Sequence, residues 1–150
     1  MGEMAKTAKR FGSECAALDK LLGYHLRRLS VSVMADLTAS LSGLGLKPVE
    51  ASILFVIGSQ PGITQSDIGK VLGILRANMT PLVAALITQG LVERKRADGR
   101  SHALSLSSAG QALARKASVA TEAHEERVFG SLSRATRAHL IAQLRRLWQP

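Results

Sequence analysis

Four side chains within residues 76–81 have the chemistry to recognise the edges of base pairs. Arg76, Asn78 and Thr80 carry hydrogen-bond donors, and Pro81 presents a small apolar surface. Arginine can pair with guanine through two hydrogen bonds and asparagine with adenine, while an apolar group can contact a thymine methyl. An apolar stripe follows to Gly90, so these residues open a predicted helix whose polar end contacts something other than the core. The alternatives are a surface ion pair for Arg76 and a helix cap for Asn78.

A predicted β-hairpin after this helix carries a second group of cations. Residues 91–96 and 102–106 alternate apolar with polar positions around a glycine-containing turn. Its basic residues are Arg94, Lys95, Arg96 and Arg100. A hairpin beside a helix in the major groove lies where the next minor groove passes, so we expect Arg100 to enter that groove. Asp98 is expected to hold Arg100 by an ion pair and not to contact DNA. The alternative is a solvated charged surface.

Gln65 and Ser66 begin the predicted helix that precedes the one starting near residue 75. Their side chains would offer donors to DNA phosphates, and helix capping is the alternative role.

Composition favours duplex DNA as the partner. The 150 residues carry a formal charge of +9 and 46% apolar content, which suffices for a core. Aromatic residues are only 3%, too few for the stacking platforms of single-strand and RNA binders. A single cysteine, no signal-like N-terminus and no run of 18 apolar residues predict a cytoplasmic protein without a membrane span.

Residue patterns predict a mainly α protein with a small β-wing. Leucines and valines recur in steps of three or four over residues 15–41, and Pro48 opens a helix to Ser59. Thr64 and Asp67 have the spacing of a helix cap before residues 65–72, and Gly73 separates that helix from one over 75–89. Two short helices joined by such a turn form a helix-turn-helix. Helical patterns return over residues 108–128 and 134–148.

These elements predict one domain over residues 1–150 with a winged helix-turn-helix lobe at 48–107. The expected core of the lobe is Leu54, Ile57, Ile68, Leu72, Leu82, Leu86 and Leu104. The terminal segments, 15–41 and 108–148, cannot bury their apolar stripes within this lobe. A symmetric homodimer is the simplest way to cover them.

With the elements in this order, the chain resembles the MarR (multiple antibiotic resistance regulator) family of bacterial transcription factors. The resemblance spans residues 44–110 and rests on several short motifs in one order. They are Leu44-Gly-Leu46, Pro61-Gly-Ile-Thr-Gln65, Leu72-Gly-Ile74, Met79-Thr80, Leu82-Val83, Gly90-Leu-Val-Glu-Arg94, Asp98-Gly-Arg100 and Leu104-Ser-Leu-Ser-Ser-Ala-Gly110. One departure is Leu75, which stands where a capping Ser or Asp often opens the recognition helix.

The resemblance implies an obligate homodimer that binds a pseudo-palindromic operator. Members are usually repressors, released by a small, often phenolic or aromatic, ligand held between the dimerisation helices and the DNA lobe. His25 and Arg28 would suit a carboxylate or phenolate there, with Leu29 and Phe55 against a ring. The alternatives are a core role for Phe55 and a surface or interface role for His25 and Arg28.

Other functions have less support in the sequence. Cys15 permits a redox-sensing regulator, and the charge permits a non-specific architectural DNA-binding protein. The four histidines lack metal-ligand spacing, so we expect no metal and no other cofactor. No phosphate loop, nucleophile elbow or paired-carboxylate motif is present, which argues against an enzyme.

Overall fold

A computed structural model describes residues 17–96 and 102–148 of the chain. The chain divides into two compact units between Ala35 and Asp36, within helix α2 (Leu22–Ser42).

The N-terminal unit contains a turn over residues 17–20 followed by the first part of α2. The predicted start of this helix near residue 15 is therefore too early. Leu18 keeps the helical spacing, but its carbonyl accepts a turn hydrogen bond from the Leu21 N–H at 2.9 Å. Apolar periodicity marks the face of a helix and does not fix its first residue. The exposed apolar side chains of this unit are Leu18, Leu21, Leu22, Leu26, Leu29, Val31 and Met34.

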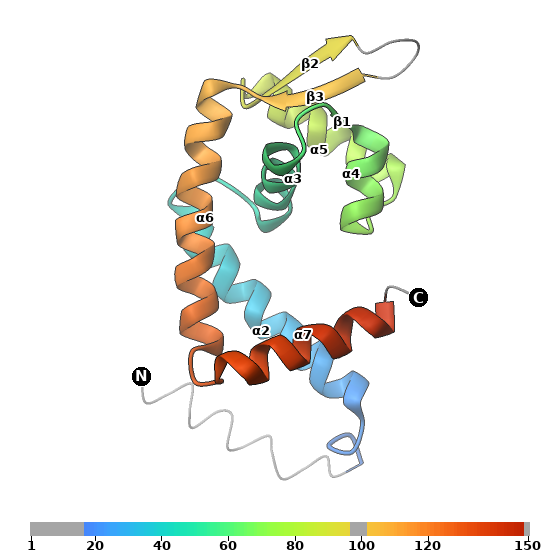
Figure 1. Cartoon of the computed structure of the whole chain (residues 1–150), viewed down its shortest axis with the longest axis vertical. Helices are drawn as coiled ribbons and strands as arrows, with labels where there is room; N and C mark the ends of the chain where they lie inside the picture. The colour runs from blue at the N-terminus through green and yellow to red at the C-terminus, as the bar shows by residue number, and fades with distance from the viewer. Residues whose placement is uncertain (1–16, 97–101, 149–150) are drawn as a thin grey trace. The chain divides into compact units, whose positions relative to one another are not determined.

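The second unit holds the remaining elements (Figure 1). In chain order they are α3 (Pro48–Ser59), β1 (Ile63–Thr64), α4 (Gln65–Leu72), α5 (Arg76–Thr88), β2 (Val92–Arg96), β3 (His102–Leu106), α6 (Ser108–Phe129) and α7 (Arg134–Trp148). The protein is thus mainly α with a small β-wing, as the sequence predicts.

Local capping signals account for most of these boundaries. Pro48 occupies the first turn of α3, where its missing N–H costs no helical hydrogen bond. The Thr64 hydroxyl accepts from the Asp67 N–H at 3.2 Å and caps α4, which ends at Gly73 in the left-handed conformation, φ 65°. The Ser107 hydroxyl accepts from the Gly110 N–H at 3.0 Å and caps α6.

The sheet has three strands in the order β1-β3-β2, where the sequence predicts only two. Both pairings are antiparallel, with Val92 opposite Leu106 and Ile63 opposite Leu104. The prediction missed β1 because two residues are too short to show an alternating pattern. Gly62, just before β1, donates to the Leu104 carbonyl at 2.9 Å.

The core of this unit lies between α3, α4, α5 and the sheet. Leu54, Ile57, Ile68 and Leu86 are fully buried and Leu104 is nearly so, as expected. Burying each such side chain contributes about 1.5–3 kcal/mol. Leu72 and Leu82 are only partly buried and pack against this core.

Helix α6 runs from the sheet to α7, so the β2–β3 hairpin and α7 lie at opposite ends of it (Figure 1). None of the α7 side chains from Arg134 to Trp148 is buried. In the described residues, no single helix is long and apolar enough to cross a membrane; α4 and α5 meet such a criterion only together, as a pair bent by 116°.

Candidate nucleic-acid interface

Helix α5 buries an apolar face from Met79 to Leu86 and exposes the polar side chains of its first turns. Met79, Val83 and Leu86 are fully buried against α3 and α4. Arg76, Asn78, Thr80 and Pro81, the predicted base-reading residues, are all exposed. These four side chains therefore take no part in the core, although Met79 in the same turns does.

The exposed polar residues of α5 occupy two sides of the helix. Arg76 and Thr80 are four residues apart and share one side, and the Thr80 hydroxyl donates to the Arg76 carbonyl at 3.1 Å. Asn78 is two residues from each, which places it about 200° around the axis from Arg76. A helix lying in a groove would thus present Arg76 and Asn78 to different base pairs.

Pro81 lies within α5, which runs without a break from Arg76 to Thr88. The helix thus begins close to the predicted residue 75 and accommodates the proline in its interior. The N–H groups of Asn78 and Met79 both donate to the Leu75 carbonyl, at 2.9 and 3.0 Å, so the first turn is tighter than a regular α-turn.

No side chain caps α5. Leu75 stands at the N-cap position without a side-chain hydrogen bond and is 75% exposed. The helix dipole gives this end a partial positive charge, which is compatible with a nearby anion.

A hollow of about 440 Å³ lies between the N-terminus of α4, the first turns of α5 and the sheet. Its lining residues are Thr64, Gln65, Ser66, Arg76, Thr80, Arg94, His102 and Leu104. Arg76 and Arg94 come from elements 18 positions apart in sequence, yet both border this one recess. The hollow is therefore a cationic concavity beside the exposed end of α5.

Gln65 and Ser66 do not cap α4, because Thr64 does. The Asp67 carboxylate accepts a hydrogen bond from the Thr64 hydroxyl and forms an ion pair with Lys70 at 2.9 Å. The hydrogen bonds from Lys70 and, to a smaller extent, from Thr64 lower the pKa of this carboxyl. The Gln65 side chain instead crosses to α5, where its Nε2 donates to Thr80 Oγ1 at 2.8 Å. Ser66 is exposed at the rim of the hollow.

The wing strands carry the predicted basic residues. Arg94 pairs with Leu104 across the sheet and lines the hollow, whereas Lys95 pairs with Ala103 and is exposed. Arg96 pairs with His102 at the end of the strands. Asp98 and Arg100, like Cys15, lie outside the described residues, so their predicted roles stay predictions.

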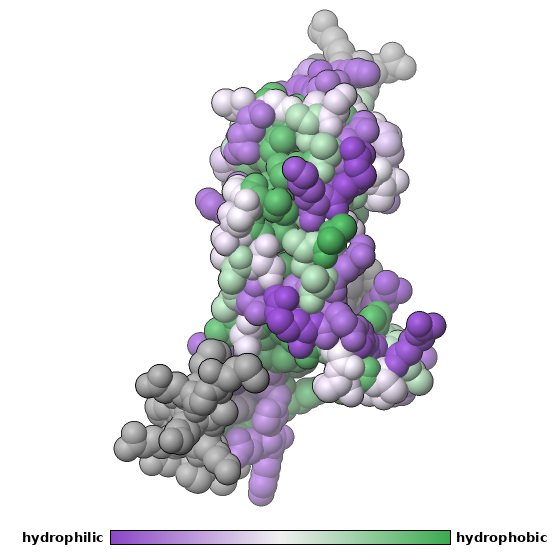
Figure 2. Space-filling model, turned by 90° about the vertical axis from the view of Figure 1, so that its left-hand side faces the viewer, coloured by the Kyte–Doolittle hydropathy of each residue, from purple (hydrophilic) through white to green (hydrophobic). Residues whose placement is uncertain are grey.

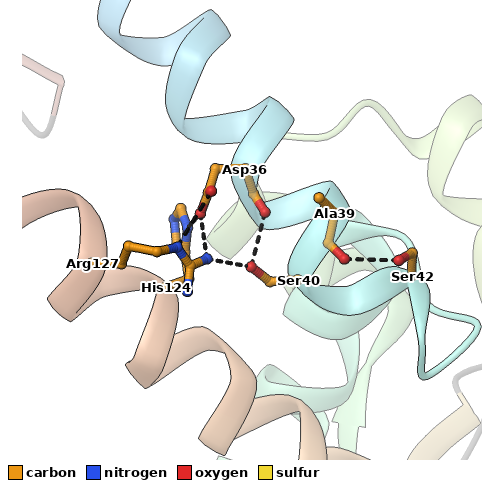
Figure 3. Close-up of polar contacts among 6 residues, drawn as sticks. All are labelled: Asp36, Ala39, Ser40, Ser42, His124 and Arg127. Carbon is orange, nitrogen blue, oxygen red and sulfur yellow. Dashed lines mark hydrogen bonds and ion pairs between the residues drawn. The ribbon is translucent and has the colours of Figure 1, made fainter. Parts of the chain in front are cut away.

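A polar cluster that the sequence did not predict fastens the end of α2 to α6 (Figure 3). Asp36 Oδ2 lies 2.7 Å from Nδ1 of the fully buried His124, and the Arg127 guanidinium donates to Asp36 and to Ser40 Oγ at 2.7 Å. Hydrogen bonds from Arg127 and then His124 lower the pKa of Asp36. An ionised carboxylate only accepts, so His124 Nδ1 carries the hydrogen. The residues that this cluster joins across α2 and α6 lie 87 to 91 positions apart, and none of them belongs to a local motif.

The four predicted ligand residues belong to different units. His25, Arg28 and Leu29 lie on the N-terminal unit, where His25 Nε2 is 2.8 Å from the Asp19 carbonyl. Phe55 lies in the second unit and lines a hollow of about 540 Å³ bordered by α3, β3 and α6. Figure 2, viewed from the side on which α6 lies in Figure 1, shows apolar side chains reaching the surface among charged ones. A pocket shared by all four residues stays a prediction.

The order of α4, α5 and the β2–β3 hairpin, with basic residues on α5 and the hairpin, defines a winged helix-turn-helix protein. Comparison with known proteins gives the family: a model described as MarR family matches residues 44–101. A putative transcriptional regulatory protein for the hcr operon of Thauera aromatica is 30% identical over 132 residues, 85% of this chain and 79% of that protein. The chain belongs to the MarR family.

Solved structures agree in fold. The transcriptional repressor CouR bound to a 23-mer DNA duplex is 33% identical, with a TM-score of 0.85 over 91% of this chain and 98% of that one. CouR bound to p-coumaroyl-CoA gives 31% identity and a TM-score of 0.82 over the same shares of the two chains. The Mycobacterium tuberculosis MarR family protein Rv2887 in complex with salicylic acid is 27% identical, with a TM-score of 0.68 over 85% of this chain and 96% of that one.

Proposed function

We propose that this MarR-family protein is a homodimeric transcriptional repressor that binds a pseudo-palindromic operator and is released by a small aromatic ligand. In this proposal each α5 lies in a major groove with its first turns toward the bases, and each hairpin follows the adjacent minor groove. A repressor acts in the compartment that holds the chromosome, so we also propose a cytoplasmic location.

The observation that carries the proposal is the exposed polar end of α5 beside the cationic hollow. A helix fits the width of the major groove, and its first turns are the part that reaches base edges. The phosphate strand between that groove and the next minor groove would pass over the recess that Arg76 and Arg94 border. The formal charge of +9 adds long-range attraction to DNA. The DNA-bound state of CouR supports the same assignment.

Exposed apolar residues support the dimer. In the second unit they gather on α7, at Leu140, Ile141, Leu144, Leu147 and Trp148. The N-terminal unit exposes its own apolar series along α2, including Leu22, Leu26 and Leu29. Surfaces of this kind on a small protein mark association sites, and a two-fold dimer covers both copies equally.

The effector class follows from related proteins. CouR binds p-coumaroyl-CoA and Rv2887 binds salicylic acid, so aromatic acids and their thioesters are the proposed ligands here. His25 and Arg28 would contact the acid, and Leu29 and Phe55 the ring. Alanine variants of Arg28 and Phe55 should weaken the thermal stabilisation that such a ligand produces, while leaving DNA binding of the unliganded protein unchanged.

The experiment that tests DNA binding uses the purified full chain and duplexes covering the DNA upstream of its own gene. The proposal predicts one discrete protected site with two half-sites about 10 base pairs apart and an affinity that falls steeply with salt. Arg76→Ala should abolish most of this binding. Lys116→Ala, which removes one positive charge from an exposed position on α6, is the control and should bind nearly as the wild type does.

Two results would contradict the proposal. Uniform coating of the probe would indicate a non-specific architectural protein, and a monomer at micromolar concentration would exclude the paired arrangement. The proposed release by a small aromatic ligand is tested by adding p-coumaroyl-CoA, salicylate and related acids to the protein–DNA complex. Release of the DNA supports it, whereas release only on oxidation, lost in Cys15→Ser, would replace the ligand with a redox signal.

A further inference from the structure

The hydrogen bond between Gln65 and Thr80 joins the first residue of α4 to the exposed side of α5. Its length is 2.8 Å from Nε2 to Oγ1, and both side chains line the cationic hollow. Thr80 is exposed and Gln65 only partly buried, so both can be reached by a molecule that enters the recess. The bond therefore sets the orientation of a polar side chain that faces the proposed DNA.

The direction of this bond is fixed by a second one. Thr80 has a single hydroxyl hydrogen, which it donates to the Arg76 carbonyl at 3.1 Å. Thr80 Oγ1 must then accept from Gln65, so the Gln65 atom in contact is the amide nitrogen and not the oxygen. One N–H of that amide is consumed, which leaves Gln65 with one donor and one acceptor, Oε1.

One donor and one acceptor on the same amide match adenine. In the major groove adenine offers N7 as an acceptor and N6 as a donor, whereas guanine offers two acceptors. A phosphate group also offers acceptors only, so it would accept from the remaining N–H but leave Gln65 Oε1 without a donor. The clamp from Thr80 prevents the amide from turning its nitrogen outward in place of its oxygen.

We propose that Gln65 is a specificity-determining residue that reads an adenine of the operator, and that Thr80 is the residue that positions it. The inference rests on the proposed DNA-binding function and replaces the phosphate contact expected for Gln65. Thr80 has no hydroxyl donor left for DNA and acts on the bases only through its methyl group and through Gln65. Arg76, on the same side of α5, reads a neighbouring base pair.

The test begins with the full-length protein and a library of duplexes containing 20 randomised base pairs, from which the wild type selects its preferred sequence. The affinities of wild type, Gln65→Ala, Thr80→Val and the double variant are then measured for that duplex and for its single-base-pair substitutions. Valine keeps the shape and methyl group of Thr80 but removes the hydroxyl, so it breaks the clamp alone. Thermal melting of each variant serves as the folding control.

We expect both single variants to lose discrimination at one and the same A·T pair, by about 5- to 150-fold for Gln65→Ala. Discrimination at the other positions should remain. The double variant should be no less selective than Gln65→Ala, because the two residues act as one unit.

Other outcomes overturn the proposal. If Gln65→Ala binds every duplex more weakly by the same factor, and the slope of log affinity against log salt falls by about 1, Gln65 contacts a phosphate. Unchanged selectivity in Gln65→Ala, or a Thr80→Val variant that matches the wild type, would show that the bond only joins the two helices. If the wild type selects no sequence at all, the proposed function fails together with the role of Gln65. If the wild type is selective and Gln65→Ala is equally selective, only the role of Gln65 fails.

Discussion

The junction between the wing and α6 depends on a glycine, and replacing it should destabilise the fold by an amount that the structure sets. A β-carbon built on Gly110 would lie 2.0 Å from the Leu91 carbonyl oxygen and 2.9 Å from its carbon. Contacts of a β-carbon below 3.0 Å are essentially never seen, so Gly110→Ala must move the start of α6 by about 1 Å. The obstacle is backbone, which cannot rotate away as a long side chain can.

A displacement of that size breaks the hydrogen bonds of the junction. The Ser107 hydroxyl donates to the Gly90 carbonyl at 2.6 Å, and the Ser107 N–H donates to the Leu91 carbonyl at 3.1 Å. An extra 1 Å, roughly, takes both beyond hydrogen-bonding range. At about 1 kcal/mol each, the free energy of unfolding should fall by about 2 kcal/mol or more, which corresponds to a melting temperature about 4–8 °C lower.

The assay is thermal unfolding followed by circular dichroism at one protein concentration, since a dimer melts at a concentration-dependent temperature. Gly43→Ala is the matched control, because a β-carbon there meets nothing within 4 Å. It should change the free energy of unfolding by less than about 1 kcal/mol in either direction. A Gly110→Ala protein that melts within about 1 °C of the wild type would refute the reasoning.

Three further predictions concern the interface and its support. Arg76→Ala and Asn78→Ala should each weaken binding of the selected duplex by about 5- to 150-fold, and their free-energy effects should add within about 0.5 kcal/mol because the residues face different base pairs; a strong coupling in the double variant would place them on one base pair. Arg100→Ala should weaken that binding by more than about tenfold in a fluorescence-anisotropy titration at fixed salt, and an unchanged affinity would remove the hairpin tip from the interface. Arg127 and His124 lower the pKa of Asp36 from its ordinary value of 3.8, so the ionised carboxylate stabilises the fold above that value, and the stabilisation is lost as pH falls through the folded pKa. Asp36→Asn should therefore lower the melting temperature at pH 7 and leave it nearly unchanged at a pH below the folded pKa; an equal loss at both pH values would contradict the ionic role.

Local signals allowed much of the fold to be predicted from the sequence. Pro48, the Thr64 cap and Gly73 each act within one helical turn. The helices that begin or end at them occur at the predicted residues. The exposure of Arg76 does not follow from periodicity, because Arg76 stands three residues before the buried Met79 and seven before the buried Val83, on the same side of the helix. It is exposed because it is the first residue of α5.

Features formed by distant residues could not be predicted in the same way. Strand β1 exists only because β3 pairs with it, and its two residues carry no pattern of their own. The Gln65–Thr80 bond joins residues 15 positions apart, and the Asp36–His124–Arg127 cluster joins α2 to residues of α6 at least 88 positions away. Such contacts depend on how the helices pack, and polar residues on helices are usually solvated, so their types alone did not indicate a partner.

The central claim is that the first turns of α5 lie in the major groove of duplex DNA. Cross-linking tests it most directly, with Ala77→Cys in a Cys15→Ser background and the selected duplex carrying a thiol tethered to a major-groove base edge. Ala77 is exposed on α5 between the two reading sides, so we predict a disulfide at one base position in each half-site. Val119→Cys, exposed on α6, should form none. No cross-link from residue 77, or cross-linking no more efficient than from residue 119, would contradict the account.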